Sequence, residues 1–197
     1  MPLYETSALF ILLYAYQKLT GDTSYAARYE TLLDCYAEWL APNTLYPARQ
    51  PISVDMIRPT ANQTGLAIQS TIGLKAASII TNNSTYSTLV ANFVNAIYYG
   101  GLGLDGLSPE ESTHFTYNYG REQTWNVLFP SFSDVVLELN TFPEEAWDLQ
   151  SDWYSTQIQE LGLPFAGPIN DYHYTGGRFN WGITDWSKSN TIPSPLP

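Results

Sequence analysis

The chain has 197 residues and is 44% hydrophobic, which is enough to bury a core and argues against a disordered segment. Its formal net charge is -11 with only eight Lys and Arg residues, so no basic run is present to bind nucleic acid or an anionic membrane surface. No apolar run is long enough to span a membrane, and Met1 is followed at once by Pro2 and Glu5, so we expect no signal peptide here.

Apolar residues at helical spacing predict two helices in the first part of the chain. The first covers about 6–19 and is stopped by Gly21, and the second covers about 24–40 and ends before Pro42. The lone cysteine, Cys35, falls within the apolar pattern of the second helix. We therefore expect it to be a buried structural thiol.

Four more helices are predicted in the remainder of the chain. The third covers about 62–80, and a fourth follows the turn at 82–84. The fifth covers about 123–139, where Pro130 must kink the helix or delay its start. The sixth begins near 143 and reaches about 161.

The connections between these helices alternate in length. Tight turns join the first helix to the second, the third to the fourth and the fifth to the sixth, whereas long connections occupy 41–61, 100–122 and 162–183. This alternation predicts stacked helical hairpins, with every tight turn at one end and every long connection at the other.

Long connections in a compact domain usually carry function, so the end that they share is the predicted working end. Helix capping is the alternative role for each of the polar residues at this end. The residues expected there are Glu5, Asp55, Asn62, Gln63, His114, Glu122, Trp125, Asp171, His173 and Tyr174.

The residue types favour carboxylate chemistry at this end. The chain has only two histidines, His114 and His173, and one cysteine, so no zinc pattern can be drawn and we expect no cofactor. Nucleophile elbows and phosphate-binding loops are missing as well. Asp and Glu remain as general acid and base, and helical toroids with paired carboxylates commonly hydrolyse glycosidic bonds.

Four segments resemble one family. Met1–Thr6 is similar to a family segment MPxEES, and Ile52–Asp55 followed by Ala61–Ile68 is similar to LSTDDF…LANQTNLALKG. Trp153–Phe165 is similar to WYPT…YGVPLD, and Thr184-Asp185-Trp186 is similar to SDW. The family is the fungal glutaminase A family, whose members are extracellular enzymes that release ammonia from glutamine.

The resemblance implies an all-α (α/α) toroid of six helical hairpins, of which about three are present in a partial domain over residues 1–187, followed by an irregular tail over 188–197. A small-molecule or glycan substrate and an extracellular location are implied as well. The sequons at Asn62, Asn82 and Asn83 are compatible with secretion. The catalytic candidates are Glu5, Asp55 and Asp185, and the substrate-binding candidates are Asn62, Gln63, Trp125, His173, Tyr174 and Trp186.

Departures from the family pattern keep two other functions open. Met56 replaces the second Asp of DDF, and Gln69 replaces the Lys of LALKG. A glycoside hydrolase-like toroid acting on sugars, or a non-catalytic remnant or binding module, are the alternatives to a glutaminase. About three hairpins leave a ring unclosed, so we also expect exposed apolar faces and self-association.

Overall fold

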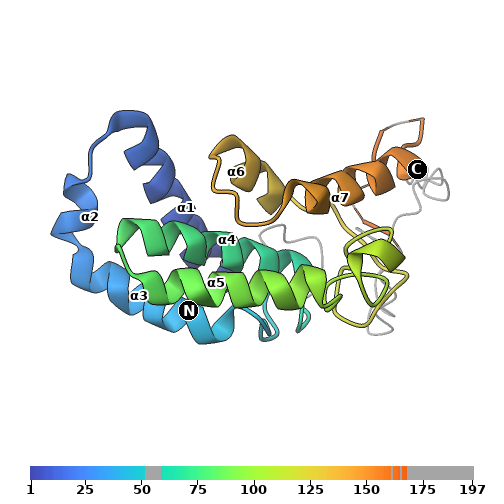
Figure 1. Ribbon diagram of the computed structural model, residues 1–197, viewed down its shortest axis with the longest axis horizontal. Coiled ribbons are helices and arrows are strands. Elements are labelled where there is room, and N and C mark those ends of the chain that lie inside the picture. Colours follow the sequence, from blue (N-terminus) through green and yellow to red (C-terminus); the bar gives the residue numbers. More distant parts are fainter. Residues whose placement is uncertain (52–58, 161, 165, 168–197) are drawn as a thin grey trace, which may run out of the picture.

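The computed structural model describes residues 1–51, 59–160, 162–164 and 166–167, and within these ranges the chain is all-α (Figure 1). The only β-type pairings there are isolated bridges, such as the one between Gln63 and Asn118. None of the helices in this part of the chain is both long and apolar enough to cross a membrane. The predicted all-α fold class is confirmed.

The first hairpin pairs α1 (Leu3–Thr20) with α2 (Ser24–Arg28) and α3 (Glu30–Asn43). The predicted second helix is interrupted at Tyr29, whose φ of -114° and ψ of 20° leave the helical region. Its predicted end before Pro42 was wrong, because α3 continues to Asn43 and includes that proline in its last turn.

Cys35 lies on the solvent side of α3, so its predicted burial was wrong. The buried face of this helix carries Leu33, Ala37 and Leu40, which are spaced four and three residues apart. Cys35 is two residues from Leu33 and therefore about 200° around the helix axis from the buried face.

The second hairpin consists of α4 (Thr64–Ile80) and α5 (Ser84–Val94). Asn82 takes a positive φ of 52° in the turn between them, and the side chain of Asn83 caps α5 by accepting a hydrogen bond from the Thr85 N–H at 3.0 Å. A five-residue π-helix, η1 (Asn95–Tyr99), continues directly from α5.

The third pair consists of α6 (Pro130–Val136) and α7 (Glu144–Gln157), and the 3-10 turn η2 (Pro109–Glu111) lies in the long connection before it. The predicted bounds 123–139 were wrong, but the structure bears out one of the two effects predicted for Pro130: it delays the start of the helix and occupies the first turn of a helix of only seven residues. The sixth helix begins where it was predicted, with Pro143 at its N-cap, and ends at Gln157 rather than at Leu161.

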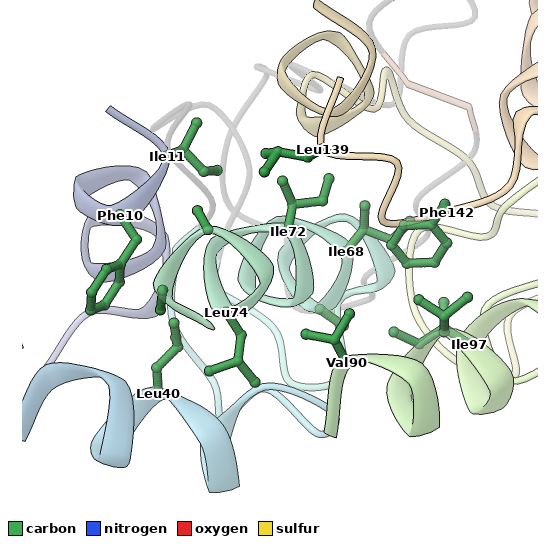
Figure 2. Packing of buried hydrophobic residues seen from close by; sticks show 14 of the residues in the cluster. Phe10, Ile11, Leu40, Ile68, Ile72, Leu74, Val90, Ile97, Leu139 and Phe142 are labelled. Carbon is green, nitrogen blue, oxygen red and sulfur yellow. The ribbon is translucent and has the colours of Figure 1, made fainter. Parts of the chain in front are cut away.

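The core is built around α4, which α1, α3, α5 and α6 contact directly (Figures 1 and 2). Its side chains are buried almost all round, as expected for a helix enclosed by others. Gly73 permits the close approach of α1, because a Cβ there would lie 2.5 Å from the Cβ of Ser7. Figure 2 shows that α1, α3, α5 and the connection after α6 all supply apolar side chains to this cluster: Phe10, Ile11, Leu40, Val90, Leu139 and Phe142.

Candidate functional site

The N-termini of α1 and α4 meet at the end of the bundle that the long connections share. Gln50 joins them, because its side-chain oxygen accepts from the Leu3 N–H at 2.6 Å and its backbone oxygen accepts from the Gln63 side chain at 2.7 Å. The segment after η2 joins the same end, since the Thr64 N–H donates to the Tyr117 carbonyl at 2.9 Å. For the described residues, the predicted gathering of long connections at one end is therefore confirmed.

Four of the nine predicted site residues are described, and all four lie at this end. Glu5 is exposed in the first turn of α1, and Asn62 is exposed with a positive φ of 55°. Gln63 and Trp125 are buried. The other five lie outside the described residues: Asp55, His173, Tyr174, Asp185 and Trp186.

The Gln63 amide takes part in the hydrogen bonding of the fold itself. Its Nε2 donates to the carbonyls of Gln50 and Thr60, and its Oε1 accepts from the Tyr117 hydroxyl at 3.2 Å. The side chain thus joins the connection before α4 to the connection after η2. Contact between Gln63 and a substrate stays a prediction.

Trp125 belongs to an aromatic group formed with α7. Its ring centre lies 6.4 Å from that of Trp153, edge to face, and 6.1 Å from that of Tyr154. Its backbone carbonyl accepts from the Gly167 N–H at 2.9 Å. A Cβ at Gly167 would lie 2.1 Å from the indole nitrogen, so the close approach of backbone and ring requires glycine.

A carboxylate and an imidazole form the most organised polar group at this end. The Asp105 carboxylate accepts from the backbone N–H groups of Thr113 and His114 at 2.8 and 3.0 Å, and from the Thr113 hydroxyl at 2.7 Å. The His114 Nδ1 lies 2.9 Å from that hydroxyl oxygen and 3.3 Å from the carboxylate. The Asp105 side chain is therefore held from three directions.

Burial and hydrogen bonding shift the pKa values of both groups. Burial lowers the pKa of His114, although Asp105 and the backbone carbonyls of Thr124 and Glu122 favour the charged ring. For Asp105, burial would raise the pKa, but the hydrogen bonds from Thr113 and His114 outweigh it and the pKa lies below its usual value. Both shifts favour a neutral imidazole beside an ionised carboxylate near neutral pH.

The helix α7 supplies the opposite wall of this group. Trp153 stacks on the His114 ring with the ring centres 4.0 Å apart and the planes 14° apart. One turn earlier, the Gln150 side-chain oxygen accepts from the Phe115 N–H at 2.8 Å. Several buried polar atoms around this wall have no hydrogen-bond partner: His114 Nε2, Asn126 Oδ1, Gln150 Nε2 and Trp153 Nε1.

The sequence predicted His114 at this end but did not indicate its neighbours Asp105 and Thr113. Asp105 and Thr113 lie in an irregular connection, where no periodicity indicates which side chains meet. The sequence feature that comes nearest to indicating this polar group is Trp153, which lies in a segment that resembles the family pattern. In the part of the chain that the structure describes, no cluster of three or more His, Cys, Asp or Glu side chains is arranged to hold a metal ion.

Comparison with known proteins relates this chain to one protein family. The model of a family described as "Glutaminase A six helical-hairpin domain" matches residues 1–190. Glutaminase A of Aspergillus oryzae (strain ATCC 42149 / RIB 40) is 29% identical over 171 residues, which cover 83% of this chain and 24% of that protein. The chain thus spans about a quarter of the length of this relative. No solved structure matches the chain significantly.

Proposed function

Because the chain belongs to the family of the glutaminase A six helical-hairpin domain, we propose that it contributes the hydrolysis of L-glutamine to glutamate and ammonia. The observation that carries the proposal is the match over residues 1–190, which includes the whole of the long-connection end. The similarity to Glutaminase A of A. oryzae agrees with the proposal.

The geometry of this end supports amide hydrolysis. Such a reaction needs a proton acceptor to activate water and a donor for the departing nitrogen. The Asp105–His114 pair supplies a fixed imidazole, and the buried polar atoms of Gln150, Asn126 and Trp153 supply amide and indole groups that can pair with a carboxamide. We further propose Glu5, Asp55 and Asp185 as its carboxylates, and an extracellular location for the protein.

The proposal is tested by the release of ammonia from L-glutamine by the full 197-residue chain. L-asparagine serves as the shorter amide, and a panel of aryl glycosides tests the glycoside hydrolase alternative. We expect ammonia from glutamine, less from asparagine and no aryl alcohol from the glycosides. Hydrolysis of the glycosides, or no turnover of either amide, would contradict the proposal.

A further inference from the structure

We propose that a cleft between α1 and α2 is a binding site for a neutral saccharide. Its volume is about 570 Å³, within the roughly 300–1,000 Å³ of small-molecule sites. Figure 1 shows the corner that α1 and α2 form at one edge of the molecule. Tyr16 in the cleft follows Leu3 by thirteen residues of α1, about 20 Å along the helix, so the cleft is separate from the long-connection end. We call this the α1–α2 cleft: Leu13, Tyr16, Asp22, Ser24, Tyr25 and Arg28.

Asp22 lies at the corner of the cleft, where the chain leaves α1 and enters α2. Its Oδ2 accepts from the Tyr16 hydroxyl and its Oδ1 accepts from the Ser24 N–H, both at 2.8 Å. Hydrogen bonds from Ser24 and Tyr16 lower the pKa of this carboxyl, so it is ionised near neutral pH. An ionised carboxylate offers about four lone-pair positions, so Asp22 keeps acceptor capacity toward a ligand.

Arg28 supplies hydrogen-bond donors on the α2 side of the cleft. Its side chain is exposed, and its guanidinium carbon lies 5.5 Å from the centre of the Tyr29 ring. The ion pairs formed among the described residues do not include Arg28, although the chain carries a net charge of -11. A guanidinium has five N–H donors and no acceptor. The cleft therefore presents an acceptor-only group and a donor-only group that do not neutralise each other.

Two tyrosine rings give the cleft its apolar walls. Tyr16 is 44% exposed and Tyr25 is 48% exposed, and the half-buried Leu13 adds aliphatic surface. The Tyr16 hydroxyl is held by Asp22, and the Tyr25 ring lies against Tyr29 with the ring centres 4.7 Å apart. Because both rings are held before a ligand arrives, binding loses little side-chain entropy.

This combination fits a saccharide better than it fits a charged ligand. A sugar hydroxyl both donates and accepts, so it pairs with Arg28 and Asp22 alike. The C–H groups on one face of a pyranose ring carry partial positive charge, and the face of a tyrosine ring carries partial negative charge. A small anion is repelled by Asp22 and a small cation by Arg28, whereas a neutral ligand meets neither repulsion.

Titration of the full ¹⁵N-labelled chain with four neutral trisaccharides tests the site. The four are built from glucose, galactose, mannose or N-acetylglucosamine, and the protein is kept at a concentration at which it sediments as a monomer. For at least one of them we expect saturable shifts of the backbone N–H signals of 22–29, none in the 113–118 segment, and an affinity that added salt does not change. No binding of any of the four, or shifts in the 113–118 segment instead, overturns the proposal.

Tyr25→Ala and Arg28→Gln test the two kinds of contact. We expect each to weaken the affinity for the bound trisaccharide by about tenfold, because one removes a ring face and the other a charged donor. Tyr99→Ala on η1 is the matched control: Tyr99 is 54% exposed and packs on its neighbour Tyr98 with the ring centres 5.1 Å apart. It should bind as the wild type does. Unchanged affinity in either cleft variant, or an equal loss in Tyr99→Ala, overturns the proposal.

Amino acids decide between a neutral and a zwitterionic ligand. We expect L-glutamine and L-glutamate to leave the N–H signals of 22–29 unmoved, and saturable shifts there from either one would overturn the saccharide assignment. The site is independent of the proposed function, so Tyr25→Ala and Arg28→Gln should keep the wild-type rate of ammonia release. If the wild-type chain releases no ammonia, the proposed function is wrong, and the trisaccharide titration still decides the role of the α1–α2 cleft.

Discussion

Asp105 organises the long connection after η1 with a single side chain. Its carboxylate joins residues eight and nine positions later in the sequence, and the Asp105 N–H donates to the His114 carbonyl at 3.2 Å. The connection is thereby closed on itself around the short 3-10 turn η2. Because burial disfavours the charge and the hydrogen bonds restore it, the loop is sensitive to protonation at both Asp105 and His114.

Acidification should destabilise the chain through His114. The folded-state pKa of this ring is lowered by burial, so the stability it contributes is present above the unfolded pKa of about 6.5 and is lost as pH falls through the folded value. As the pH falls below about 6.5, we expect the free energy of unfolding of the wild type to fall more steeply than that of His114→Asn. Urea unfolding at several pH values measures this, and parallel curves for the two proteins would contradict it.

Gly73→Ala should destabilise the chain strongly, because the added Cβ meets the backbone and Cβ of Ser7 on α1. Overpacking of this kind costs about 1–3 kcal/mol, and backbone contacts do not relax easily. Gly21→Ala is the reference: its φ of 73° strains an alanine, but the added Cβ meets nothing within 4 Å. Urea unfolding should rank Gly73→Ala as the more damaging, and the reverse order would contradict the close α1–α4 packing.

Among the elements, those with continuous apolar periodicity were predictable from the sequence. α1, α4 and α5 follow this periodicity, and α7 begins directly after Pro143, close to the predicted start. The short length of α6 was not predictable, because residues 123–129 form backbone hydrogen bonds to other segments of the chain instead of the bonds of a helix. Leu128, for example, donates its N–H to the Tyr154 hydroxyl at 2.7 Å. The pairing of Asp105 with His114 could not be predicted for the same reason, because it depends on tertiary contacts and not on the local periodicity of the sequence.

Asp134 should be essential to the connection between α6 and α7. Its buried carboxylate accepts from the N–H groups of Thr141 and Phe142 at 2.9 and 3.1 Å. Asp134→Ala leaves both buried donors unpaired, so we expect a loss of about 3 kcal/mol in the free energy of unfolding. Asp152→Ala, an exposed site on α7, should stay within about 0.5 kcal/mol of wild type. Equal effects of the two changes in urea unfolding would refute this role.

At the scale of the whole molecule, we propose that the chain self-associates through apolar side chains on α1 and α6. The end of α1 is joined to the residue that follows α6, because the Lys18 Nζ donates to the Leu137 carbonyl at 2.7 Å. Large apolar groups are exposed on both, with Leu19 at 82% and Phe132 at 71%. Burying each such side chain contributes about 1.5–3 kcal/mol. We call this surface the α1–α6 face: Leu12, Tyr16, Leu19, Phe132, Val135 and Val136.

Sedimentation velocity tests this proposal. We expect the sedimentation coefficient to rise with protein concentration, and added salt should favour association by screening the net charge of -11. The double variant Leu19→Ser, Phe132→Ser should remain monomeric at higher concentration. Leu107→Ser is the control, because Leu107 is 85% exposed but lies in the connection after η1. A wild-type chain that is monomeric throughout, or an equal effect of the control, would contradict the α1–α6 face.

We propose that the long-connection end binds an amide substrate. The most direct measurement is the titration of the ¹⁵N-labelled chain with L-glutamine, followed by amide and indole N–H shifts, with D-glutamine as the matched control. We expect saturable, stereospecific shifts at Trp125, Trp153 and the 113–118 segment, and none at the turns that contain Gly21 and Asn82. Shifts concentrated at those two turns, or identical responses to both enantiomers, would contradict it.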